Sequence, residues 1–170
     1  LYGEWYDADL QTADEPSDKA FCRRCVVHYV RTIADYMNAN HPQMESMCCI
    51  MPVDREMWAE AAGVTTLGHL GPALYWLNHE RDVQEMRPIV RDMADPGRKH
   101  GKQHHEWLQA WKAKAGREDR ILQQGRILIE EKPDALYVWA WYAQVGTTES
   151  AENPEAAWAR ACQVLREAKG

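Results

Sequence analysis

Residues 134–146 of the chain, DALYVWAWYAQVG, carry only one plainly polar side chain between the two end residues, that of Gln144. The large apolar side chains of this stretch point in every direction around a helix of about 3.6 residues per turn. Asp134 can accept hydrogen bonds from the first turn of such a helix, and Gly146 can adopt the left-handed conformation that ends many helices. We therefore predict a central helix over residues 134–145, buried on several sides.

The composition is typical of one soluble, acidic, Trp-rich domain. The chain has 170 residues, of which 45% are hydrophobic, with eight Trp, seven Tyr and one Phe. This length is sufficient for one sizeable core. The net charge of -6 disfavours general binding of nucleic acid, because phosphate neutralisation requires clustered Lys and Arg.

Targeting signals are not visible in the sequence. No apolar run approaches the roughly 18 residues of a membrane span, and the first 30 residues are acidic, unlike a signal peptide. Five cysteines without a secretion signal predict reduced thiols and a cytoplasmic location. We expect no contact with a membrane.

The chain divides into an acidic aromatic arm, residues 1–20, and a single helical domain, residues 21–170. Apolar spacings of three and four predict helices along most of the second part. The longer patterns cover residues 18–38, 66–77, 82–93, 99–115, 118–131, 134–145 and the segment from Pro154, and shorter ones cover residues 43–51 and 55–62. We predict an all-α domain of seven or eight helices packed as antiparallel hairpins.

One hairpin is expected to join two apolar seams. The first seam runs from Leu67 to Leu77 and the second from Val83 to Met93, with both repeating at helical spacing. Residues 95–97, Asp-Pro-Gly, are typical of a turn and should end the second helix. We expect the two seams to face each other as an antiparallel pair.

The C-terminal part resembles a tetratricopeptide-like helical hairpin, roughly over residues 100–168. Expected helices start near residues 99, 118, 134 and 154, so that alternate starts lie about 35 residues apart, close to the family's period. Pro133 precedes a helix, and the large and small positions of the family are matched by Trp139, Ala143, Ala157 and Ala161. The resemblance implies paired helices and a groove for a peptide or partner protein. Ordinary helical hairpins are the alternative, because Ile121 stands where the family has a small residue.

Four cysteines form a first candidate metal site. Cys22 and Cys25 have the C-x-x-C spacing, and Cys48 and Cys49 are adjacent, so the two pairs could hold a structural zinc ion. Packing in the core is the favoured alternative, because free cysteine is among the most buried residue types. A disulfide between the two segments is a third interpretation.

Two histidines form a second candidate metal site. His100 and His104 would share one helix face, and His69 or His79 could supply a third ligand. Such an arrangement faintly resembles the histidine-bearing bundles of DinB-like hydrolases and transferases, which implies a metal-dependent enzyme. The neighbouring Arg and Lys residues favour a solvated basic face instead.

Residues 98–120 are the only locally basic region of this acidic chain, and we expect them to meet the N-terminal arm, an acidic partner or an RNA. No catalytic residue and no cofactor-binding motif is identified. We therefore expect a non-enzymatic interaction or assembly module that binds another protein or itself. The alternatives are a metal-dependent helical-bundle enzyme using His100 and His104, or a structural zinc domain using Cys22, Cys25, Cys48 and Cys49.

Overall fold

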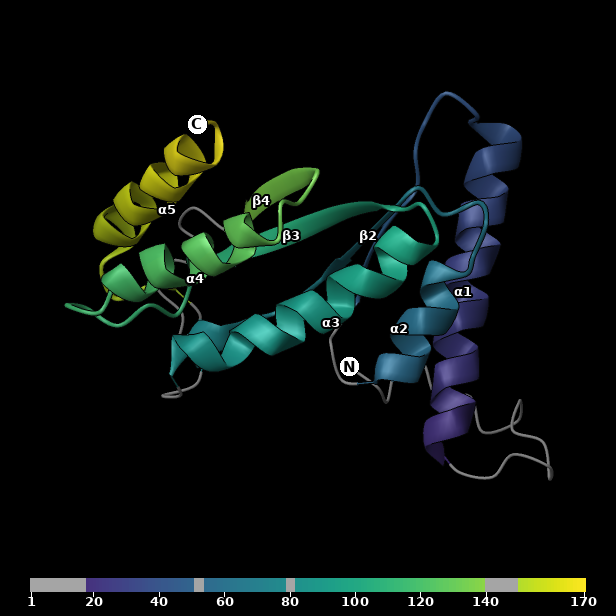
Figure 1. Cartoon of the computed structure of the whole chain (residues 1–170), viewed down its shortest axis with the longest axis horizontal. Helices are drawn as coiled ribbons and strands as arrows, with labels where there is room; N and C mark the ends of the chain where they lie inside the picture. The colour runs from purple at the N-terminus through teal and green to yellow at the C-terminus, as the bar shows by residue number, and fades with distance from the viewer. Residues whose placement is uncertain (1–17, 51–53, 79–81, 140–149) are drawn as a thin grey trace.

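A parallel β-sheet forms the centre of the molecule (Figure 1). The computed structural model describes residues 18–50, 54–78, 82–139 and 150–170. The four strands are β1 (Met47–Ile50), β2 (His69–Pro72), β3 (Gln103–Gln109) and β4 (Ala135–Trp139). They lie side by side in chain order, and every neighbouring pair is parallel. The domain is therefore α/β, and the prediction of an all-α domain of seven or eight helices is wrong.

Helices connect and flank the strands. Within the described ranges these are α1 (Asp18–Asn40), α2 (Arg55–Ala62), the 3-10 helices η2 (Trp76–Asn78) and η3 (Val83–Glu85), α3 (Met86–Lys99), α4 (Asp119–Glu130) and α5 (Pro154–Ala168). Helix α1 packs beside α2, and α5 packs beside α4 (Figure 1). Parallel neighbours require crossover connections, and right-handed crossovers that always step in the same direction leave their helices on one face of the sheet.

The hydrophobic core lies between the sheet and these helices. Alternate strand residues point into it, namely Cys48, Ile50, Leu70, Leu108, Leu136 and Val138. One cluster packs β1 and β2 against α1 and α2, with Trp58 of α2 fully buried. The other packs β3 and β4 against α3, α4 and α5. Because strand side chains alternate between faces, the intervening residues occupy the face of the sheet away from the helices.

The expected central helix over residues 134–145 is wrong for the part that the structure describes. Residues 135–139 form β4, whereas residues 140–149 lie outside the described ranges. Leu136 and Val138 contact the core, but Tyr137 and Trp139 are 37% and 50% exposed. The apolar residues that seemed to surround a helix instead supply the two faces of a strand, which Tyr, Val and Trp favour.

Four helices predicted from apolar spacing are confirmed. They are α1, α2, α4 and α5, and three of their local signals also hold. Asp54 caps α2 by accepting hydrogen bonds from the N–H groups of Glu56 and Met57. Asn153 caps α5 through the N–H of Ala156, with Pro154 in the first turn. These signals depend only on residues a few positions apart, so they hold regardless of the tertiary fold.

Three expected helices are strands or irregular segments. Residues 47–50 form β1 and residues 103–109 form β3, and residues 66–77 contain β2 followed by the start of η2. Leu67 and Leu70 belong to the cluster beside α1 and α2, whereas Leu74 and Leu77 belong to the other cluster. The leucine seam is therefore not one helix face, and the antiparallel pairing of the two seams is wrong.

The second seam does form a helix face, but the helix ends later in the chain than predicted. Val83, Met86, Val90 and Met93 are all buried, as their spacing predicts. The Asp-Pro-Gly segment, residues 95–97, does not form the expected turn, because α3 continues through it to Lys99. The chain leaves the helix at His100, and Gly101 adopts a φ of 67°, which glycine tolerates without steric cost.

The tetratricopeptide resemblance is also overturned. Its paired helices would have to include residues 103–109 and 135–139, which are the paired strands β3 and β4. Two helices of this region, α4 and α5, do contact each other, but a strand lies between them in the chain. The spacing of about 35 residues between expected starts thus reflects successive strand and helix units. The acidic arm predicted for residues 1–20 lies outside the described ranges up to residue 17.

Candidate interaction surface

The sheet face away from the helices is lined by uncharged and aromatic side chains. We call it the open face and define it by the strand residues that alternate with the core positions, namely Met47, Cys49, His69, Gly71, Gln103, His105, Trp107, Gln109, Ala135, Tyr137 and Trp139. None of these eleven residues is Asp, Glu, Lys or Arg. Parallel sheets are usually covered on both faces, so an aromatic second face to which none of the described helices packs requires an explanation.

Rings of neighbouring strands contact one another across the open face. The ring of His105 on β3 lies 5.7 Å from that of Tyr137 on β4 and 6.5 Å from that of His69 on β2, measured between centroids. Trp107 lies 5.0 Å from Tyr137 and 6.3 Å from Trp139. Edge-to-face and tilted geometries at these separations are attractive for aromatic pairs. The rings therefore form one continuous apolar layer from β2 to β4.

Exposure on this face increases from its middle towards its two edges. His105 and Gln109 of β3 are fully buried. Met47 on β1 is 47% exposed, and Trp139 on β4 is 50% exposed. Large apolar side chains that are half exposed next to other partly exposed rings are typical of surfaces that bind another protein.

Buried ring nitrogens on the open face have no partner. Within the described part of the chain, neither ring nitrogen of His105 has a hydrogen-bond partner, and the indole N–H of Trp107 has none. Burial, followed by the nearby His104 and His69, lowers the pKa of His105 to about 4. His105 is thus neutral at pH 7 and contributes to an uncharged surface.

Gly71 allows β2 and β3 to approach each other closely at His105. A Cβ atom on Gly71 would overlap the carbonyl oxygen and ring carbon Cδ2 of His105 and would lie 2.5 Å from its Nε2. Only glycine leaves room for this contact, which is a common reason for glycine inside a strand. The absence of a side chain at this position therefore fixes where the imidazole of His105 lies.

The helix side of β3 carries a buried polar pair. The ring Nε2 of His104 lies 2.7 Å from Oε1 of Glu106, and both residues are almost completely buried. Burial raises the pKa of Glu106, although the hydrogen bond from His104 opposes this shift. Asp134 braces the same strand, because its carboxylate accepts from the N–H of His104 and its own N–H donates to the His104 carbonyl, both at 2.7 Å. Asp134 therefore links the start of β4 to β3 by hydrogen bonds and does not form the expected helix cap.

The carboxyl ends of β2 and β3 are held together by Gln109. Its side-chain oxygen accepts from the N–H of Leu77 at 2.9 Å, and its amide donates to the carbonyl of Trp111 at 3.0 Å. Next to it, the rings of Tyr75 and Trp111 meet edge to face at 5.1 Å. The buried amide therefore fixes two loops at the sheet edge where open α/β sheets usually bind ligands.

The structure does not bring the histidine pair onto one helix face. His100 is exposed at the end of α3, whereas His104 is buried on β3 with its side chain towards Glu106. His69 lies on β2 and contacts Glu45 at 2.6 Å instead, while His79 lies outside the described ranges. Among the described residues, no group of three or more His, Cys, Asp or Glu side chains could hold a metal ion. A metal at His100 and His104 therefore gains no support from the geometry.

The four cysteines lie on two different elements. Cys22 and Cys25 are on α1, and Cys48 and Cys49 are adjacent on β1, so the last two point to opposite faces of the sheet. All four are free thiols. Burial raises the pKa of Cys48 to about 11 and that of Cys49 to about 12. Because a bound zinc ion itself deprotonates its thiol ligands, these pKa values do not exclude the zinc site, which remains a prediction.

Two cations of the basic region at residues 98–120, Lys102 and Arg98, have partners within the described part of the chain. Lys102 points inwards and donates to the carbonyls of Val64 and Leu67, both at 2.7 Å. Arg98 forms ion pairs with Asp95 and Glu131. Because these cations already have partners, the expected docking of an acidic arm or polyanion has a weaker basis than the sequence indicated.

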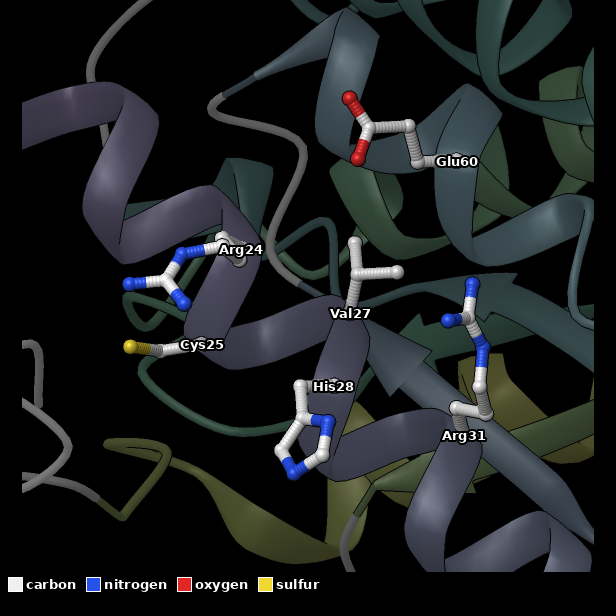
Figure 2. A pocket seen from close by; sticks show the side chains of 6 residues that line it. All are labelled: Arg24, Cys25, Val27, His28, Arg31 and Glu60. Atoms are coloured by element: carbon white, nitrogen blue, oxygen red, sulfur yellow. The ribbon is translucent and has the colours of Figure 1, made fainter. Parts of the chain in front are cut away.

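A shallow groove of about 360 Å³ lies along α1 and α2. Its lining includes Arg24, Cys25, Val27, His28, Arg31 and Glu60. Figure 2 shows that the side chains of Arg24 and Arg31 extend in different directions from α1. Binding sites normally place a few polar groups so that they converge on the ligand. The groove therefore does not have the organisation of a specific site.

The sequence interpretation missed the open face because its residues lie on four separate strands. The available signal was the run of β-preferring residues at 135–139, with Tyr137 and Trp139 two positions apart. On β3 the polar and apolar residues do not alternate cleanly, since His104 and Glu106 face the helices. The polarity pattern of β3 therefore could not have identified the face.

No protein-family model matches the chain, and no curated protein matches its sequence. Among the described helices, none is both long and apolar enough to cross a membrane. Function is therefore inferred from the geometry of the chain itself.

The stability of the protein is expected to fall between pH 6.5 and pH 4 because of His105. Its pKa is about 4 in the folded chain and about 6.5 when unfolded, so the unfolded chain binds more protons in this window. The contribution is fully present above pH 6.5 and lost as the pH falls through about 4. A difference of about 2.5 pKa units corresponds to roughly 3 kcal/mol over the whole window.

Urea denaturation at pH 7.5 and pH 4.5 measures this effect. The variant His105→Gln should lose part of the pH dependence, whereas His28→Gln, which changes an exposed histidine on α1, should retain it. Equal pH dependence in wild type and His105→Gln would show that the imidazole is not buried in neutral form.

Proposed function

We propose that this chain is a protein assembly module that binds another polypeptide through the open face and the edges of its sheet. The observation that carries the proposal is the aromatic open face, on which Trp139 is half exposed and lies against the ring of Trp107 on β3. A monomeric soluble protein seldom leaves such a patch in water.

The sheet edges support the same conclusion. Within the described residues, β1 and β4 each pair with one neighbouring strand only, so their outer backbone N–H and C=O groups face away from the sheet. Open strand edges promote pairing with another chain unless charge, proline or a covering element blocks them. The open-face side chains of both edge strands are uncharged. An edge and an apolar face together favour a protein partner over a small ligand.

Variants on the open face test this function in the native source. We expect the tagged wild-type chain to migrate in a complex larger than the chain itself, and Trp139→Glu to abolish that complex. The matched control is Tyr36→Glu on α1, where an aromatic residue that is 57% exposed receives the same charge far from the open face. A complex that persists in Trp139→Glu would refute the proposed function.

A further inference from the structure

We propose that the partner is a second copy of this chain, and that the two copies close into one barrel of eight parallel strands. This inference rests on the proposed function and specifies its partner. The sheet has four parallel strands in chain order, with its helices on one face. A closed parallel barrel has about eight strands in sequential order with all helices outside. Each chain therefore supplies half of the required strands.

Two-fold symmetry satisfies the strand directions. If the symmetry axis lies along the barrel axis, it leaves all strands pointing the same way, so that β4 of each copy can pair in parallel with β1 of the other. Both outer edges are used in this arrangement, and the contact is made by the same surface on each copy. Closure removes the open edges altogether.

The register of the observed sheet indicates which residues would meet. Cys49 of β1 pairs with Gly71 of β2, Gly71 lies beside His105 of β3, and His105 pairs with Ala135 of β4. The first residue of β4, Ala135, is therefore level with the third residue of β1, Cys49. In an eight-stranded barrel of this kind the strand register is displaced by about eight residues after one full circuit, which is called the shear. Each half of the barrel therefore contributes a displacement of about four residues. Continued in the same direction, this shift places Met47 of the second copy beside Tyr137, and Cys49 of the second copy beside Trp139.

The chemistry of these edge residues suits such a contact. Met47 and Trp139 are about half exposed, and sulfur and aromatic rings attract one another when they pack. Each copy carries a net charge of -6, so two copies would repel if acidic surfaces met. None of the open-face residues, however, is itself Asp, Glu, Lys or Arg, and the central histidine is neutral, although the carboxylate of Glu45 contacts His69 near the β1 side of this face. Contact through the open face would therefore bring fewer like charges together than contact through acidic surfaces.

Sedimentation equilibrium of the purified 170-residue chain gives the first test. We expect a mass twice the 19.6 kDa of one chain at micromolar concentration. Trp139→Glu, or Met47→Glu on the opposite edge, should raise the dissociation constant at least about 30-fold, as expected for a central aromatic contact. Tyr36→Glu should dimerise as wild type does. Circular dichroism confirms that each variant remains folded.

An oxidative cross-link gives the second test. Trp139→Cys should form a disulfide with Cys49 of the second copy, and adding Cys49→Ser should abolish that bond. A purified chain that stays monomeric at about 100 µM, or masses that grow beyond two copies, would overturn the closed dimer. A dimer without the cross-link would overturn the barrel geometry.

The two proposals can fail separately. If the native complex disappears in Trp139→Glu while the purified chain is monomeric, the open face binds a different polypeptide and only the second copy is wrong. If the native complex is unaffected by Trp139→Glu, the assembly function itself is wrong.

Discussion

Gly71→Ala is expected to lower the free energy of unfolding by about 4 kcal/mol, the largest effect of a single methyl group that we anticipate in this protein. The added Cβ would overlap the carbonyl oxygen and the ring of His105. A backbone oxygen cannot move aside without separating β2 from β3, so the clash cannot be relieved by a change of rotamer. Urea denaturation followed by far-ultraviolet circular dichroism measures the loss.

Gly97→Ala is the matched control for this prediction. A Cβ at Gly97 would meet only the side chain of Lys102, at 3.9 Å, which is an ordinary contact. Because Gly97 lies inside α3, alanine should be neutral or stabilising by up to about 1 kcal/mol. If Gly71→Ala were within about 1 kcal/mol of wild type, the close approach of the two strands at His105 would be wrong.

Gly125→Ala is expected to cost roughly 3 kcal/mol, close to the upper end for overpacking in a core. Gly125 lies inside α4, and its Cβ would overlap both methyl groups of Val164 on α5 and lie 2.9 Å from the Val164 Cβ. Valine has little rotamer freedom in a helix, so its methyl groups cannot turn away. The close packing of the two helices therefore depends on this glycine.

A double mutant separates the clash from other effects of the substitution. Val164→Ala alone should destabilise by creating a cavity, but it should also make room for the methyl group of Gly125→Ala. The double variant should be more stable than the sum of the single effects by at least about 1 kcal/mol. Strictly additive effects would show that Gly125 and Val164 do not touch.

The assembly hypothesis drawn from the sequence remains a proposal, and its structural basis has changed. The expected helical groove does not exist, since β3 and β4 occupy the region that was expected to form it. The metal-site hypotheses drew on His100, His104 and two pairs of cysteines, which the fold distributes over α1, α3, β1 and β3. Spacing along the chain was a poor guide there, because a strand sends adjacent residues to opposite faces.

The sequence by itself determined the helices whose signals are local. Asp54 and Asn153 mark the starts of α2 and α5 by bonds to residues two or three positions away. The buried faces of α3 and α4 follow from their apolar periodicity. A helix makes its backbone hydrogen bonds within one segment, so these features can be inferred without knowing the fold.

The tertiary structure alone decided the strands and the surface they create. The partners of β4 lie about 30 residues earlier in the chain, where His105 meets Ala135 and Gln109 meets Trp139. The apolar run at 135–139 is compatible with a buried helix or with a strand. It forms a strand because β3 lies next to it and pairs with its backbone. A strand becomes stable when its backbone groups are paired by distant residues, and this pairing has no local signature in the sequence.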